Sequence, residues 1–187
     1  MAFKVYYNGT DLSNIVDGFT GITRNIGAGW TNNMQTKPKL GSDFPQNSIN
    51  SKSITINFVV NVKKDRFTSV RKALGEVLNV NEPCALIFDD DPNSVWYAVP
   101  DGTPTLDESS FYQAFGTLTF LVPSGYAESV DTKTLNNDNS GQENGTIINN
   151  ADNSISVLIN NNGTLPIYPT IKITPTAESG FFGIAGQ

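Results

Sequence analysis

Carboxylates are the side chains most able to do chemistry in this chain, because its 187 residues include no histidine and a single cysteine, Cys84. The lack of histidine excludes Ser-His-Asp and Cys-His catalysis and histidine-ligated metal sites. One cysteine excludes a disulfide within the chain and cysteine-rich metal sites. We expect Cys84, which precedes an apolar run, to be buried and unreactive. Cation binding and acid–base chemistry by carboxylates remain to be considered.

Three consecutive aspartates, Asp89, Asp90 and Asp91, are the first candidate for a cation site. Calcium and magnesium prefer carboxylate oxygens, but calcium-binding loops space their ligands, and adjacent residues cannot all face one ion. An aspartate that bonds back to the backbone, here ahead of Pro92, is typical of a turn. We therefore interpret the segment from Asp89 to Asn93 as a turn between strands and predict no metal site.

A second group of carboxylates lies near aromatic residues that could stack on a sugar ring. A carboxylate pair can hydrolyse a glycosidic bond without histidine. The spacing here singles out no pair, and exposed carboxylates on turns are common. We predict no catalytic residue, no cofactor and no enzymatic activity. The carboxylates are Asp101, Asp107 and Glu108, and the aromatic residues are Trp96, Tyr97, Phe111 and Tyr112.

The charge balance indicates a structural or binding protein. Lysine and arginine number 12 against 18 acidic residues, which gives a net charge of -6. Specific nucleic-acid binding is not expected, since it requires clustered basic residues. The segment Gly27-Ala28-Gly29 lacks the context of a phosphate-binding loop. The sequence has no run of about 20 apolar residues, so we also predict no membrane insertion.

Short strands and one helix are the elements expected to position these residues. Asn8-Gly9 is a strong hairpin signal, because both residues tolerate positive φ. One amphipathic helix is expected over residues 67–78, where apolar residues recur at helical spacing. This pattern predicts a mainly β (α+β) fold, an antiparallel sandwich-like sheet that packs one helix. Strands are expected at residues 3–7, 54–60, 85–88, 95–99 and 116–122.

The chain divides into three zones by composition. Residues 1–128 contain most of the structural signals and are expected to form an N-terminal domain. Residues 129–153 are rich in Asn and Gly and are expected to be a polar linker or extension. Residues 154–187, with strands expected at 155–159 and 170–174, are expected to begin a second β-sandwich. Two strands cannot bury a core alone, so they either pack on the first zone or begin a second domain that this chain does not complete.

Residues 25–50 have glycines and prolines but little hydrophobic periodicity. We interpret them as a long loop or extended arm. Loops of this length in compact domains are usually functional. With the strand that follows, the arm could pair with or clasp a neighbouring copy of the chain.

The order of these motifs resembles the distal tail protein family of siphophages. The resemblance covers residues 50 to 175 in ordered pieces. Its later part is similar to the start of the family's galectin-like C-terminal domain. The motifs are the helix from Phe67, then Asn81-Glu82-Pro83, Leu86 to Pro92, Tyr97-Ala98-Val99, Asp101-Gly102, Gly116 to Pro123, Gly125-Tyr126-Ala127, Asn161 to Thr164 and Tyr168 to Ile173.

The resemblance implies a structural protein of the virion, located at the distal end of the phage tail after assembly in the host cytoplasm. Family members form hexameric rings whose N-terminal domains are a belt around a central DNA channel. The implied partners are copies of the chain itself, the tail tube protein, a tail-associated or tail-tip protein, and receptor-binding or side-fibre proteins. The negative net charge is compatible with a channel that DNA traverses without binding.

One alternative function stays open, a carbohydrate-binding β-sandwich module for host cell-wall saccharides. Such modules present exposed aromatic side chains on which sugars stack. Trp30 and Trp96 are the candidate residues for that role.

Overall fold

The computed structural model describes residues 3–27, 29–37, 41–61, 64–108, 112–152, 154–174 and 183. The chain divides into two compact units, Met1–Thr132 and Lys133–Gln187. No helix among the described residues is long and apolar enough to cross a bilayer.

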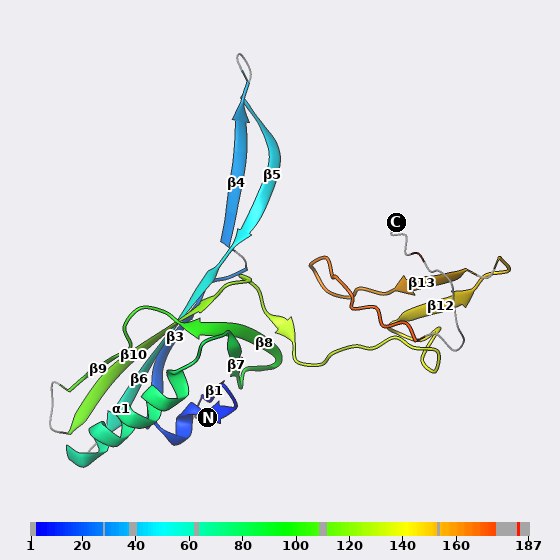
Figure 1. The fold of residues 1–187 in the computed structure, drawn as a ribbon. Helices are drawn as coiled ribbons and strands as arrows, with labels where there is room; N and C mark the ends of the chain where they lie inside the picture. The colour runs from blue at the N-terminus through cyan, green and yellow to red at the C-terminus, as the bar shows by residue number, and fades with distance from the viewer. Residues whose placement is uncertain are drawn as a thin grey trace. The chain divides into compact units, whose positions relative to one another are not determined.

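A nine-stranded antiparallel sheet and one helix make up most of the first unit (Figure 1). Seven strands follow the order β2-β1-β7-β8-β10-β6-β3, while β9 pairs with β10 and β11 pairs with β8. The strands are β1 (Val5–Tyr7), β2 (Thr10–Asp11), β3 (Gly18–Arg24), β6 (Lys52–Asn61), β7 (Cys84–Phe88), β8 (Asp91–Pro100), β9 (Thr105–Asp107), β10 (Gln113–Val122) and β11 (Glu128–Ser129). The helix is α1 (Lys64–Leu78), and a 3₁₀ turn, η1 (Leu12–Asn14), follows β2.

The sheet curls so that its two halves face each other. β8 and β10 share only two register pairs, Phe120↔Pro100 and Leu121↔Val99. Beyond that junction the Tyr7 ring of β1 lies 4.7 Å from the Phe120 ring of β10, although β7 and β8 separate these strands in the sheet order. The predicted mainly β, sandwich-like fold with one helix is confirmed.

The core lies between these halves and contains alternate residues of the long strands. Ile54, Ile56 and Phe58 on β6 are almost completely buried, as an alternating pattern requires. α1 adds Phe67, Val70 and Leu74 to the same cluster.

Tyr7 brings a polar hydroxyl group into the core. Its hydroxyl donates a hydrogen bond to the Ala98 carbonyl oxygen at 3.1 Å, which satisfies a polar group that has no access to water. Burial raises the pKa of the Tyr7 hydroxyl to about 12. Tyr7 therefore connects β1 to β8 and remains neutral at physiological pH.

Most predicted elements are present. The five expected strands correspond to β1, β6, β7, β8 and β10, and the expected helix begins three residues early, at Lys64. Asn8 and Gly9 both have positive φ in the turn from β1 to β2, as predicted. Cys84 is only half-buried, because it begins β7 at the margin of the core.

Four strands of the main sheet, β2, β3, β9 and β11, escaped prediction, and one predicted turn is too long. β2 and β11 are only two residues long. β3 has two glycines and a bulge between Phe19 and Gly21, which break the alternation expected of a strand. β9 is only three residues long. The predicted turn from Asp89 to Asn93 is confined to Asp89 and Asp90, since β8 already begins at Asp91.

The second unit contains one antiparallel hairpin, β12 (Gly145–Asn149) paired with β13 (Ile155–Ile159). β13 was predicted, whereas β12 lies in the segment expected to be a linker. The strand predicted at 170–174 is wrong, because within the described residues this segment pairs with no other strand. Alternation alone does not make a strand when no neighbour accepts its backbone hydrogen bonds. Exposed apolar residues of this unit are Ile148, Ile155, Val157, Leu158, Ile159, Ile167, Tyr168, Ile171 and Ile173.

Gly116 provides a sharp test of core packing. A Cβ atom built at Gly116 would lie 2.0 Å from the Phe58 ring, so Gly116→Ala must displace that buried ring. We expect the free energy of unfolding, measured by urea denaturation, to fall by about 1–3 kcal/mol.

The matched control is Gly75→Ala on α1, where an added Cβ meets nothing within 4 Å. Alanine is the better helix former, so this variant should gain about 0.5–1 kcal/mol. Equal changes in the two variants would contradict the packing described for β6 and β10.

Candidate interaction surface on the projecting hairpin

Two strands, β4 and β5, form a β-hairpin that projects from the rest of the first unit (Figure 1). β4 (Gly29–Thr36) pairs with β5 (Ser42–Asn50) in a separate two-stranded sheet. Every residue of β4 is exposed. The predicted loop is therefore a hairpin, which we call the arm. Its strands were missed because they are rich in Asn, Thr, Ser and Gln and contribute no face to the core.

One face of the arm, which we call its apolar face, carries apolar residues on either side of the Asn32–Asn47 pair, and a β-bulge adds one of them. Trp30 lies directly opposite Ile49, and alternation along β4 puts Met34 on the same face as Trp30. The register shifts between Asn33 and Gln35, so that two residues of β5 oppose Met34 alone. This shift moves Phe44 from the polar side to a position opposite Met34.

The two faces of the arm consequently differ in chemistry. On the apolar face Trp30, Met34 and Phe44 are each more than half exposed, and Ile49 is half-buried. The other face carries amide and hydroxyl side chains from Thr31, Asn33, Gln46, Ser48 and Asn50. On that face the Asn50 side-chain amide donates to the Thr31 hydroxyl at 2.7 Å.

The root of the arm is fixed by a buried lysine. Lys52, the first residue of β6, is only 5% exposed. Its ammonium donates a hydrogen bond to the Gly27 carbonyl oxygen at 3.0 Å and lies 4.4 Å from the centre of the Trp96 ring. Burial, and to a lesser extent the charge of Arg24, lowers the pKa of Lys52. The sequence alone does not single out Lys52, although its phase matches the buried residues of β6.

Arg24 at the end of β3 makes a second polar contact near the root. Its guanidinium forms a two-point ion pair with Asp90 in the turn between β7 and β8. It also lies 4.6 Å from the centre of the Phe88 ring. Hydrogen bonding from Arg24 lowers the pKa of the Asp90 carboxyl. Of the three aspartates considered as a cation site, Asp90 is thus the partner of an arginine.

Gly125 packs against the other strand of the arm. It has a φ of +77°, and a Cβ there would lie 2.0 Å from the Asn50 backbone oxygen. Both the backbone conformation and the space favour glycine at this position. The end of β5 therefore lies against the loop that follows β10.

The carboxylates considered for catalysis are not gathered into a site. Glu108 pairs with Arg71 of α1 at 2.7 Å, Asp107 ends β9, and Asp101 follows β8. No group of three or more potential ligands for a metal ion occurs among the described residues. Of the aromatic residues, Trp96 packs partly against the core, Tyr97 and Tyr112 are exposed, and Phe111 lies outside the described residues.

The two tryptophans considered for sugar stacking lie in different settings. Trp30 is exposed on the arm, whereas the ring of Trp96 is covered on one face by the Lys52 ammonium. In the described part of the chain the two rings make no contact with each other, so they do not form a shared surface for a sugar.

A groove of about 750 Å³ runs beside α1 in the first unit. Phe58, Leu74, Leu106 and Leu118 contribute apolar side chains to it, and Arg71 lies at its polar part. Lys72 and Glu76 also line it, and the Arg71 guanidinium pairs with Glu108.

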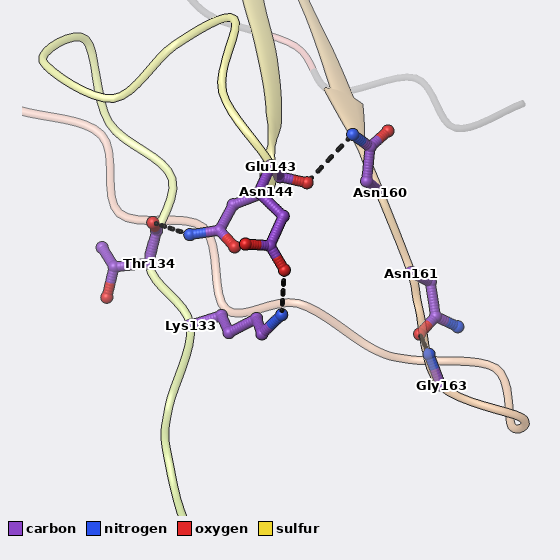
Figure 2. Close-up of polar contacts among 7 residues, drawn as sticks. All are labelled: Lys133, Thr134, Glu143, Asn144, Asn160, Asn161 and Gly163. Atoms are coloured by element: carbon purple, nitrogen blue, oxygen red, sulfur yellow. Dashed lines mark hydrogen bonds and ion pairs between the residues drawn. The ribbon is translucent and has the colours of Figure 1, made fainter.

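In the second unit, asparagine side chains hold the chain around the hairpin (Figure 2). The Asn144 amide donates to the Thr134 carbonyl oxygen at 3.1 Å, and the Asn160 amide donates to the Glu143 carbonyl oxygen at 3.0 Å. Lys133 forms an ion pair with Glu143 at 3.1 Å. These contacts order a polar segment without a buried core.

The Arg24–Asp90 pair predicts a pH dependence of stability. Because the pKa of Asp90 is lower in the folded chain than its ordinary value of 3.8, the pair stabilises the fold above pH 3.8. That stabilisation is lost as the pH falls through the lower, folded-state pKa. Asp90→Asn should therefore reduce the free energy of unfolding at pH 7, by less than about 1 kcal/mol for so exposed a pair.

The measurement is urea unfolding at pH 7 and at pH 2–3, with Asp91→Asn as the control for the loss of one charge. The difference between Asp90→Asn and the unmodified chain should shrink in acid. A difference that does not change with pH would contradict the assigned pair.

A comparison with known protein families finds a match over most of the first unit. Residues 6–122 match the family described as phage tail protein RIFT-related domain. Among solved structures, the chain is similar to the Dit (gp 19.1) protein of phage SPP1, reported as a paradigm of the hub adsorption apparatus in phages that infect Gram-positive bacteria. The TM-score is 0.58 at 16% identity.

The match covers 72% of this chain and 55% of the SPP1 protein, so the chain spans about half of that protein's length. At this identity the likeness concerns the fold. No curated protein matches the sequence significantly. The family match covers well over half of the chain and confirms the predicted resemblance to siphophage distal tail proteins. The chain belongs to the phage tail protein family defined by the RIFT-related domain.

Proposed function

We propose that this phage tail protein forms a ring at the distal end of the tail, where it acts as a structural hub. The observation that carries the proposal is the combination of a family-matched domain with a projecting arm whose apolar face is exposed. Its role is assembly, and no catalytic step is assigned to it.

A closed ring requires two different contact surfaces on each subunit, because successive subunits meet head to tail. The arm supplies one such surface. Trp30, Met34 and Phe44 lie on one side of a hairpin that no described segment covers. Exposed apolar patches mark sites of protein contact, and aromatic residues and methionine are enriched in such contacts. We propose that this face binds the neighbouring copy.

The proposed ring is a hexamer around a central DNA channel. Its partners would be the tail tube protein on one side and a tail-associated or tail-tip protein on the other. Receptor-binding or side-fibre proteins would attach through the C-terminal part. The net charge of -6 supports a channel that does not retain DNA, since like charges repel phosphate.

The domain assignment is part of this proposal. Residues 1–128 would form the belt domain, residues 129–153 would connect it, and residues 154–187 would begin the C-terminal sandwich. The exposed apolar residues of β13 support this assignment, because a sandwich buries one face of each sheet against the other.

Replacement of two aromatic or apolar residues on the arm tests the ring. Light scattering and negative-stain images of the purified chain should show a ring of several copies with an open centre. Trp30→Ser combined with Phe44→Ser should yield monomers, because it removes the apolar contact but leaves a folded first unit. Circular dichroism verifies that folding.

The matched control is Asn33→Ala combined with Ser48→Ala on the opposite face of the arm, which should still form rings. Rings of unchanged size in the Trp30/Phe44 variant would contradict the arm contact. A chain that stays monomeric at the highest attainable concentration would count against self-assembly of the ring.

A further inference from the structure

We propose that Lys52 is a positioning residue that fixes the direction of the arm. The inference deepens the proposed function, on which its consequence for ring assembly rests. Its structural part, that Lys52 holds the root of the arm, stands on the contacts of the first unit alone.

Lys52 occupies a place that the sheet pattern reserves for an apolar residue. It lies in the core-facing row of β6 with Ile54 and Ile56, opposite Val122 of β10. Among the described residues, Lys52 is the one charged side chain that is buried. Such a position is costly for an ammonium, since burial of a charge without a paired carboxylate opposes folding.

The groups around Lys52 offset this cost only in part. The described residues supply the Gly27 carbonyl oxygen at 3.0 Å and the face of Trp96 at 4.4 Å, and no described carboxylate forms an ion pair with Lys52. Arg24 adds a repulsive positive charge nearby. An apolar side chain at this position would stabilise the core as well as lysine does, or better. Core packing therefore does not explain the lysine, and we look to the contacts of its ammonium group.

Those contacts connect the arm to the main sheet. Gly27 belongs to the connection from β3 to β4, while Trp96 belongs to β8. The ammonium thus connects the entry of the arm to a strand of the core, and it contacts both groups only when the arm leaves the sheet in one direction. Gly125 holds the other strand through its close approach to Asn50. Together these contacts fix both strands at the root.

A fixed root matters because the arm has no core of its own. An isolated two-stranded hairpin is marginally stable in water. An arm held in one direction also loses less conformational entropy when it binds a partner than a free hairpin does. Lys52 would therefore affect assembly without touching the neighbouring subunit.

The test compares Lys52→Met with Lys52→Arg and with Lys4→Met, which removes an exposed lysine of the same unit. Hydrogen exchange is measured for the backbone amides of β4 and β5 in the full chain, and urea unfolding is measured in parallel. Lys52→Met should keep or raise the urea midpoint, yet accelerate exchange in the arm by about tenfold while exchange in β6 and β10 stays unchanged. Lys52→Arg and Lys4→Met should leave exchange in the arm close to that of the unmodified chain.

Unchanged exchange in the arm of Lys52→Met would overturn the inference, whatever happens to the ring. Faster exchange in the arm with loss of the ring supports both proposals. Faster exchange with an intact ring supports the role of Lys52 and contradicts the arm contact, so the two failures are distinguishable. If Lys52→Met does not fold, Trp96→Leu removes the aromatic face and should loosen the arm in the same way, and unchanged exchange in that variant would overturn the inference.

Discussion

The structure depends on the burial of one face of β6. This strand pairs with β10 along its full length on one side and with β3 on the other, and its alternate residues from Ile54 to Val60 enter the core. A shift of one residue would expose all of them and bury their polar neighbours, so the register of three strands is fixed together. The same row begins with Lys52, which extends the influence of this strand from the core to the root of the arm.

The arm is stabilised in a different way from the main sheet. Its two strands satisfy each other's backbone groups, but they bury little apolar surface. Its stability must come from the root, where Lys52, Gly27 and Gly125 make close contacts. The apolar face that results is exposed in the single chain, as expected of a surface that is completed by assembly.

Two of the acidic residues that could suggest chemistry have structural partners, since Asp90 pairs with Arg24 and Glu108 pairs with Arg71. The chain belongs to a phage tail family, and its fold is similar to that of the SPP1 hub protein. Ring formation, the partners and the location at the tail end are the proposals that experiments must now test.

The mainly β class, the long strands, the helix and the Asn8-Gly9 turn are predictable from the amino-acid sequence, because these features depend on local periodicity and backbone preference. The family resemblance was also visible in the order of motifs. The pairing of β4 with β5 is not predictable in this way, since neither strand has a core-facing pattern. Only the tertiary structure puts Phe44 on the same face as Trp30, because a bulge reverses the phase that the sequence implies. Lys52 became significant for the same reason, since the carbonyl and the ring that hold its ammonium come from residues 25 and 44 positions away along the chain.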